Sequence, residues 1–424
     1  MNRLTSAIAA LALAGLFSSV WMAAPVGASG AHSNASIHGT ISFWNAYNAS
    51  PPTPNENSVL TGKVIPKFEK LYPNVKVDAV NYPYNGLEQK VFAQMPLGSG
   101  PDVLRSDIIW VPQLAKAGVL DALDKFSWFK TYAKTVFPGT LKTNYYKGHD
   151  YGISLDTNTR VLISSDVVLK QAGIKAPPTT IKQFLTDCGK IKALGGSHYC
   201  YAEGGTGSWN VNPWIWSWGG AITNHSFSKS TGYLNDNKSV NAVQMLVNLL
   251  KHGEMTPTIL GSGIGTSDCL GKYECGFIID GPWMKPIFAG IYPKLAYKFS
   301  LMPGVGHTGV SVTGGEDIVV SKFSKNQAAS QAFVKFMLSK WAQEQMGNIG
   351  QMSVLKSLAG CKCQPGYFKT FADQLLHARP RTPSPNEAEI DNAISNAVAA
   401  SLRGQGTVKS NLTTAAGLID GYVK

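Results

Sequence analysis

Aromatic and amide side chains crowd into one short stretch of this chain. Residues 209–218 read WNVNPWIWSW, which places four tryptophans within ten residues. Trp214 and Trp218 are four residues apart and share one face of a helix, so that face is expected in a core. Trp209 and Asn210 precede the helix and are the better candidates for ligand contact. A flat indole ring offers apolar area with few rotatable bonds, and an amide offers hydrogen-bond donors and acceptors.

Charged side chains mark a second stretch, GPDVLRSDIIW at residues 100–110. Arg105 and Asp107 directly follow a predicted buried strand, and a surface ion pair is the alternative interpretation of these two charges. Further along the chain, Asp156 ends the stretch YGISLD. Glu88 lies at the start of a predicted helix, where it is a candidate for ligand contact and equally a solvated helix residue.

The elements that must position these side chains alternate between strand and helix. Strands are predicted at 40–44, 75–80 and 102–104, and helices at 59–71, 87–95 and 112–118. This order is typical of an α/β layer with a parallel sheet. Ligands bind such sheets in the crevice beyond the carboxyl ends of the strands. Aromatic and polar residues follow all three predicted strand ends: Trp44 with Asn45, Tyr82 with Tyr84, and Arg105 with Asp107.

The composition indicates a large folded chain that is exported. With 424 residues, of which 44% are hydrophobic, it is long enough for two domains. Residues 1–28 combine Arg3, an apolar stretch and small residues before Ala28, which predicts a cleaved secretory signal; an uncleaved membrane anchor is the alternative. The formal net charge of +12 is carried by dispersed lysines. An anionic cell wall or an acidic medium explains it at least as well as nucleic acid does, so no nucleic-acid partner is expected.

Six cysteines fall into three local pairs along the chain. Because an exported protein keeps its disulfides oxidised, bonds are predicted for two pairs, Cys188 with Cys200 and Cys269 with Cys275. Cys361 and Cys363 are separated by one residue, and a ring that small is strained, so only their proximity is predicted. A zinc site is the rival interpretation, but no CxxC pair and no adjacent histidine supports it, and no metal is expected.

Several motifs occur in an ordered set over most of the chain. They are Phe43-Trp44, KFE at 67–69, YPNVKV at 72–77, GSGPDV at 98–103, LAKAGVL at 114–120, YGISLD at 151–156, CGFIIDGPW at 275–283 and Gly314-Gly315. This set resembles the extracellular solute-binding proteins of sugar ABC transporters, the family of the maltose- and trehalose-binding proteins. The resemblance covers nearly all of the mature chain.

The resemblance implies an α/β fold of two discontinuous lobes, joined by a hinge around a central ligand cleft. Residues 37–155 and 303–338 are expected to form the N-terminal lobe. Residues 156–302 and 339–424 are expected to form the C-terminal lobe.

The resemblance also implies roles for individual residues. In the family, an aromatic residue at the position of Trp209 stacks on the sugar, and the tryptophan of the GPW element, Trp283 here, stacks on it from the second lobe. Asp156 matches an acidic position that hydrogen-bonds the sugar. Asp107 departs from the maltose-binding carboxylate and fits an Arg-x-Asp pattern of other branches. Gly315 is expected to present its backbone to the ligand, and a tight turn is the alternative.

The function implied by the resemblance is that of a monomeric receptor in the periplasm or on the outer cell surface. It captures a neutral di- or oligosaccharide by hinge closure and delivers it to the permease subunits of an ABC importer. Neither enzyme activity nor a cofactor is expected. Two alternatives remain: a receptor of the same fold that binds an anionic solute with Arg105, Arg160 and Arg379, and a glycoside hydrolase that uses Asp107 and Asp156 as its two carboxylates.

Overall fold

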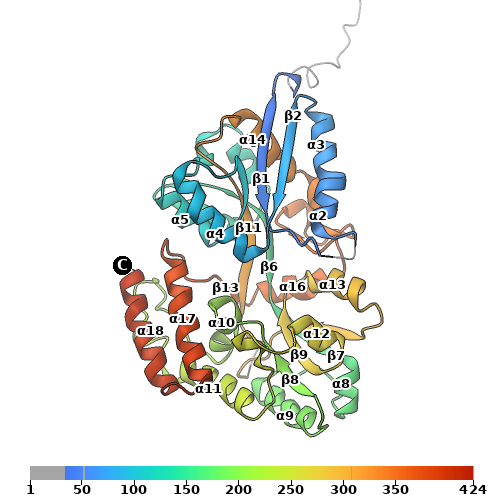
Figure 1. Cartoon of the computed structure of the whole chain (residues 1–424), viewed down its shortest axis with the longest axis vertical. Helices are drawn as coiled ribbons and strands as arrows, with labels where there is room; N and C mark the ends of the chain where they lie inside the picture. The colour runs from blue at the N-terminus through green and yellow to red at the C-terminus, as the bar shows by residue number, and fades with distance from the viewer. Residues whose placement is uncertain (1–33, 51–52, 307, 424) are drawn as a thin grey trace, which may run out of the picture.

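The computed structural model describes residues 34–50, 53–306 and 308–423. The predicted signal at residues 1–28 lies outside this range. The described chain forms two α/β lobes, which Figure 1 shows one above the other with strands running between them. No helix in this described part is both long enough and apolar enough to cross a membrane.

The first lobe is built on a seven-stranded sheet. Its main strand order is β12-β6-β11-β3-β1-β2, and β13 pairs with β11. β1 is parallel to β2 and β3, as the alternation of strand and helix predicts, whereas β11 is antiparallel to both β3 and β6. The strands are β1 Gly39–Asn45, β2 Val75–Asn81, β3 Val103–Asp107, β6 Ile153–Thr159, β11 Ser311–Val320, β12 Met352–Ser353 and β13 Ala378–Arg379.

Helices cover both faces of this sheet because each carries one apolar stripe. Phe68 of α3 meets Phe333 of α14 edge to face with ring centroids 5.1 Å apart, while Leu87 and Val91 of α4 are buried in a second cluster with Trp110. The helices are α2 Glu56–Val59, α3 Ile65–Leu71, α4 Tyr84–Gln94, α5 Trp110–Lys116, α6 Phe129–Ala133, α7 Pro138–Leu141, α14 Gln327–Met337 and α15 Lys340–Gly347. A separate hairpin joins β4 Tyr145–Tyr146 to β5 His149–Asp150.

The second lobe has a four-stranded sheet in the order β10-β7-β9-β8. As predicted, Trp214 is buried in its core, where its ring lies 4.9 Å from that of Phe184. The strands are β7 Val161–Ser165, β8 Tyr199–Ala202, β9 Cys275–Asp280 and β10 Tyr297–Ser300. The helices are α8 Asp166–Gln171, α9 Ile181–Lys192, α10 Ser208–Ser217, α11 Asn237–Lys251, α12 Thr266–Gly271, α13 Met284–Ile291, α16 Phe368–Leu375, α17 Glu387–Leu402 and α18 Val408–Tyr422.

Two strands of the first sheet connect the lobes. β6 ends at Thr159 and β7 of the other sheet begins at Val161, so only Arg160 separates them. β11 begins after the chain leaves the second sheet, with Val312 buried in the core of the second lobe and Ile318 buried in that of the first. Because β6 and β11 are hydrogen-bonded to each other, the two connections form one ladder.

Helix α15 packs on the first lobe, although residues after 338 were expected in the C-terminal lobe. Its residues Ala342 and Met346, followed by Ile349, pack in the core of the first lobe, and β12 then pairs with β6. The Ser339 hydroxyl accepts a hydrogen bond from the Ala342 amide and so starts a new helix directly after α14. Burial of the apolar residues of this helix keeps the segment on the first lobe. The chain therefore remains on the first lobe beyond the expected boundary.

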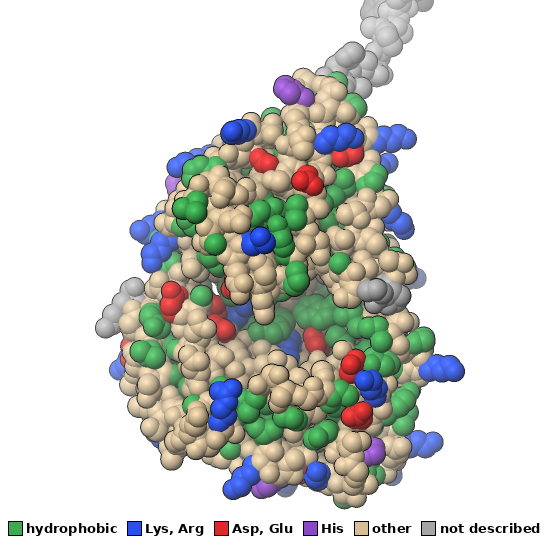
Figure 2. All heavy atoms as spheres, viewed as in Figure 1, with side chains coloured by type: hydrophobic (Ala, Val, Ile, Leu, Met, Phe, Trp, Pro, Cys, Tyr) green, Lys and Arg blue, Asp and Glu red, His purple; other side chains and the backbone are tan. Residues whose placement is uncertain are grey.

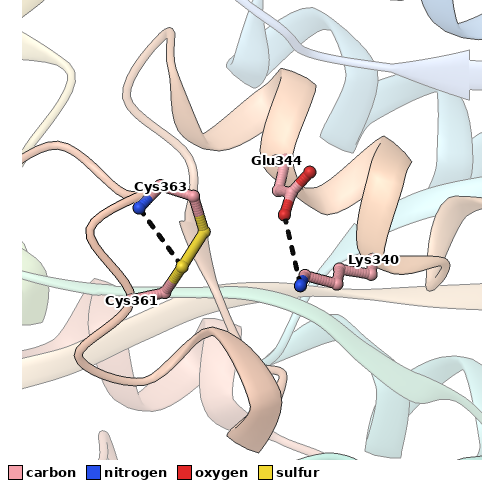
Figure 3. The surroundings of a disulfide bond; sticks show 4 residues. All are labelled: Lys340, Glu344, Cys361 and Cys363. Atoms are coloured by element: carbon pink, nitrogen blue, oxygen red, sulfur yellow. Dashed lines mark hydrogen bonds and ion pairs between the residues drawn. A yellow bond between two sulfur atoms is a disulfide. The ribbon is translucent and has the colours of Figure 1, made fainter.

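The cysteine predictions have a mixed outcome. Cys188 and Cys200 form the predicted disulfide, and Cys361 and Cys363, for which only proximity was predicted, are also bonded (Figure 3). The predicted bond between the two cysteines of α12 and β9, Cys269 and Cys275, is wrong, because both are free and buried. Burial, together with a hydrogen bond to the Cys269 thiol, raises the pKa of the Cys275 thiol well above its usual value. This disfavours the thiolate through which a disulfide forms.

Candidate functional site

A cleft of about 640 Å³ lies between the two lobes. The first lobe contributes the start of α4 and the end of β3, and the second lobe contributes the start of α10, the GPW element before α13, and one face of α17. β11 supplies Gly314, Gly315 and Glu316 between these two walls. Figure 2 shows the molecule hollowed between the lobes, with hydrophobic and charged side chains both reaching the hollow.

The structure brings most of the predicted site residues together at this cleft. Six of them line it: Glu88, Asp107, Trp209, Asn210, Trp283 and Gly315. Arg105 and Asp156 lie close by but are buried in a cluster of their own. Trp44 is the exception, because its ring packs in the core against Leu87 and meets Tyr82 edge to face at 5.3 Å. The assignment of Trp44 to the site is therefore corrected to a core role.

Arg105 is held by acidic partners beneath the cleft. Its guanidinium lies 2.8 Å from a Glu316 carboxylate oxygen and 3.2 Å from an Asp156 carboxylate oxygen, and it donates to Gln351 at 3.0 Å. Burial alone opposes the charged form, but the carboxylates of Glu316 and Asp156 raise the pKa of Arg105 above its usual value. The positive charge of Arg105 is thus balanced by carboxylates inside the protein.

Asp107 is likewise bound by neighbouring side chains. The Tyr84 hydroxyl donates to one of its carboxylate oxygens at 2.7 Å, and Arg381 donates to the other at 2.8 Å. Arg381 also lies over the Trp209 ring, with 5.6 Å between the guanidinium carbon and the ring centroid. Asp107 therefore joins the first lobe to a segment that follows β13 and leads into α17.

Two tryptophans form an aromatic platform on the second lobe. The rings of Trp209 and Trp283 are stacked, with centroids 6.3 Å apart and planes inclined by 28°. Below them, Arg160 donates to the backbone carbonyls of Trp209 and Asn210 at 3.1 and 3.2 Å and forms an ion pair with Glu203 at 2.8 Å. The Asn210 amide also donates to Glu203, at 2.7 Å, so part of its hydrogen-bonding capacity is used inside the protein.

The two glycines of β11 allow the platform and the hinge ladder to approach closely. A Cβ at Gly314 would lie 2.6 Å from the Trp209 ring, and one at Gly315 would lie 2.5 Å from the backbone oxygen of Asp156. Gly315 also has a φ of 135°, which disfavours any other residue. The prediction that Gly315 brings backbone to the cleft agrees with its position in the lining, although it lies within a strand rather than a turn.

Helix α17 was missed by the sequence analysis. Glu387, Asp391 and Ser395 follow one another at four-residue spacing and line the cleft together with Asn392. Burial raises the pKa of the Glu387 carboxyl to about 8, with Arg381 opposing the shift and Asp391 adding to it. The four-residue spacing of polar groups was visible in the sequence, but nothing local indicated that this stripe faces a cleft rather than solvent.

Comparison with known proteins finds relatives that match most of the chain. The family described as bacterial extracellular solute-binding protein matches residues 51–344. A putative binding protein of Brucella abortus (strain 2308) is 25% identical over 388 residues, covering 87% of this chain and 92% of that protein. The galactooligosaccharide-binding protein of Bacillus subtilis (strain 168) is 24% identical over 336 residues, covering 76% of each.

Solved structures show the same two-lobed fold. The GacH receptor of Streptomyces glaucescens GLA.O, known without ligand and with acarbose, superposes with a TM-score of 0.78 at 21% identity and covers 91% of this chain and 97% of that one. An ABC transporter solute-binding protein of Thermotoga lettingae TMO, bound to alpha-D-tagatose, superposes with a TM-score of 0.79 at 21% identity and covers 91% and 100%.

Proposed function

Because the chain belongs to the bacterial extracellular solute-binding protein family, we propose that it is an exported receptor for a neutral di- or oligosaccharide. The cleft closes on the sugar, and the closed receptor delivers it to the permease subunits of an ABC importer. Relatives with known ligands support a sugar, since their described ligands include galactooligosaccharide, acarbose and tagatose.

The observation that carries the proposal is the aromatic platform beside hydrogen-bonding groups. Trp209 and Trp283 offer stacked rings for the C–H faces of a sugar, and the facing wall offers the carboxylates of Glu88 and Asp107. Sugar hydroxyls form charge-assisted hydrogen bonds with such carboxylates. The mixture suits a ligand that is apolar on its faces and polar around its edge.

The charge of the cleft argues against an anionic solute. Arg105 is paired with Asp156 and Glu316, and Arg160 is paired with Glu203. Arg381 lines the cleft but already binds Asp107. These three guanidinium groups are therefore neutralised by buried carboxylates, and further acidic residues on α17 remain in the lining. Arg379, the third arginine of the anionic alternative, is exposed on β13 and does not line the cleft.

The same contacts argue against a glycoside hydrolase. A glycoside hydrolase needs two carboxyl groups that flank the scissile glycosidic bond, about 5–10 Å apart. Here Asp156 is buried against Arg105, and Asp107 is held by Tyr84 and Arg381. We therefore propose that the ligand is bound and released without chemical change.

Closure follows from the position of the two walls on different lobes. Neither wall alone can satisfy the hydroxyls and the faces of a sugar, so the ligand binds more tightly when both are in contact with it. This difference in affinity shifts the hinge equilibrium towards the closed form. We infer that the permease recognises that closed form.

The test is a titration of the purified mature protein with oligosaccharides, compared with anionic solutes of similar size. We expect a neutral oligosaccharide to change tryptophan emission, to reduce the radius of gyration in small-angle scattering, and to be recovered intact by chromatography. An unchanged radius at saturation would refute closure, and a shortened sugar would assign the protein to the hydrolases. Size-exclusion chromatography with light scattering tests the proposed monomer.

A further inference from the structure

One of the connections between the two lobes carries a disulfide bond. Leu358 is buried in a small apolar cluster of the first lobe, and Phe368 of α16 is buried in a cluster of the second lobe. Residues 359–367 between them, called the linker below, therefore lead from one lobe to the other, in addition to β6 and β11. Cys361 and Cys363 lie in this linker and are bonded to each other (Figure 3).

The two disulfides in the described part of the chain differ in their access to solvent. Cys188 and Cys200 are both fully buried, whereas Cys361 and Cys363 are partly exposed and pack against the cluster that contains Leu358. Thiol–disulfide exchange requires an incoming thiolate to reach one of the sulfur atoms, so access decides which bond reacts. The bond in the linker is therefore the one that a reagent can reach in the folded protein.

The groups around this bond favour attack by a thiolate. The backbone amide of Cys363 donates to the Cys361 Sγ at 3.2 Å (Figure 3), and such a hydrogen bond stabilises the thiolate that this sulfur becomes when the bond breaks. Lys362 is exposed between the two cysteines, and its positive charge attracts an anionic reagent. The carboxylate of Glu344, which Figure 3 draws beside the bond, is already paired with Lys340 at 3.8 Å.

The fold depends little on this bond, whereas the linker depends on it directly. A disulfide stabilises a protein mainly by restricting the unfolded chain, and the effect grows with the length of the enclosed loop. The sequence separation is 2 for Cys361–Cys363 and 12 for Cys188–Cys200. The linker bond also holds its two Cα atoms 5.1 Å apart, whereas two extended residues span up to about 7 Å. Opening it should therefore free the linker and leave both lobes folded.

We propose that Cys361–Cys363 is a thiol–disulfide exchange site, which dithiols reduce in the folded protein, and that its reduction loosens the linker between the lobes. A thiolate of the dithiol attacks the Cys363 sulfur and bonds to it, and Cys361 leaves as a thiolate. The second thiol of the reagent then attacks the reagent's own sulfur in this mixed disulfide, and Cys363 leaves. The reagent loses two electrons and becomes a disulfide, while the two cysteines gain those electrons and the reagent's two protons.

The experiment treats the folded mature protein with dithiothreitol at mildly alkaline pH, without denaturant and without a cleft ligand. The free thiols are trapped with N-ethylmaleimide at successive times and located by peptide mass mapping. We expect Cys361 and Cys363 to be labelled at least about tenfold faster than Cys188 and Cys200, whose buried bond is the internal control. Equal rates for the two bonds, or labelling of the linker pair only after unfolding, would overturn the exchange site.

Amide hydrogen exchange tests the effect on the linker. The reduced parent, and a double variant with Cys361→Ser and Cys363→Ser, should each exchange residues 359–367 at least about threefold faster than the oxidised parent. Helix α9 and strand β8, which the other disulfide joins, are the matched control and should exchange as in the oxidised parent. Unchanged exchange in the linker would overturn its loosening. Loss of protection throughout both lobes would also overturn it, because the bond would then be holding the fold.

Discussion

The two walls of the cleft are built on different principles. On the first lobe, the polar groups rest on buried ion pairs: Arg105 with Asp156 and Glu316 beneath the cleft, and Arg381 with Asp107 in its lining. On the second lobe, the lining combines the aromatic platform with the polar face of α17, and the buried guanidinium of Arg160 supports the platform through its backbone carbonyls. A change at a supporting charge should therefore cost stability, whereas a change at the platform should cost affinity.

The largest effect is expected where that contrast is sharpest, at Arg105. Arg105→Met leaves Asp156 and Glu316 buried without their cation, and such a change typically costs about 3–5 kcal/mol. Chemical denaturation followed by circular dichroism measures the loss. Lys76→Ala is the control, because it removes an exposed ion pair with Glu69 that contributes at most about 1 kcal/mol. Equal losses in the two variants would contradict the role assigned to the buried cluster.

At the aromatic platform of Trp209 and Trp283 we expect the opposite result, a loss of affinity without a loss of stability. Trp209→Ala and Trp283→Ala should each weaken sugar binding more than about tenfold without unfolding the protein, since losing a stacked ring commonly costs about 2 kcal/mol or more and tenfold requires about 1.4. Calorimetric titration of the folded variants measures this. Trp341→Ala is the control, because Trp341 packs on the first lobe and does not line the cleft. If both platform variants bound sugar as tightly as the parent protein, the binding role assigned to the two tryptophans would be wrong.

A buried carboxyl on β11 should make stability depend on pH. Burial raises the pKa of Asp317 to about 8, while the unfolded chain keeps a value near about 4. The folded state therefore retains a proton that the unfolded state releases, so the stabilisation is complete below pH about 4 and is lost as the pH rises to about 8. The slope for one such group approaches 1.4 kcal/mol per pH unit, roughly.

The Asp317→Asn variant tests this dependence. It should reduce the slope of the unfolding free energy against pH between about pH 4 and 8 by the contribution of one group, since the amide does not titrate in that range whereas Glu387 still does. Urea denaturation at several pH values provides the measurement. A variant whose profile parallels that of the parent would show that Asp317 is ionised in the folded protein.

The smallest effect is expected at Glu88 on the polar wall. Burial, with a further contribution from Asp107, raises the pKa of this carboxyl, and Trp110 donates to it at 3.1 Å. Glu88→Gln keeps an oxygen that can accept from both the indole and a sugar hydroxyl. The affinity for sugar should therefore fall by no more than about threefold, which corresponds to less free energy than a typical lost hydrogen bond. Titration calorimetry decides the point. A much larger loss would mean that this wall acts through charge.

The aromatic platform could be predicted from the sequence because its residues lie in local motifs. Trp209 lies in the first turn of α10, which begins at Ser208, so the expectation that it precedes the helix is wrong; Trp283 ends the GPW element, and both line the cleft. Trp44 was misplaced because successive strand residues point to opposite faces of a sheet, and the position of a strand end does not say which face carries the ligand. Trp44 points into the core with Leu87 and Val91.

Contacts between distant segments were beyond the reach of sequence reasoning. Asp107 and Arg381 meet across 274 positions, and Glu387 with Asp391 comes to the cleft on a helix near the end of the chain. No periodicity or turn signal records such a meeting, which depends on how the lobes pack. The free state of Cys275 shows the same limit, because the spacing led to a predicted bond with Cys269 and gave no indication that both thiols are buried and free.

The position of β11 in the sequence affects how the protein folds while it is being synthesised. This strand lies inside the first sheet between β3 and β6, yet it begins only at Ser311. A growing chain has synthesised β1, β2, β3 and β6, and the whole second sheet, before β11, the strand that joins β3 to β6, exists. Folding of the first lobe must therefore wait for late synthesis, and contacts so distant in sequence form slowly. A truncated product that ends before β11 has an open sheet edge exposed to aggregation.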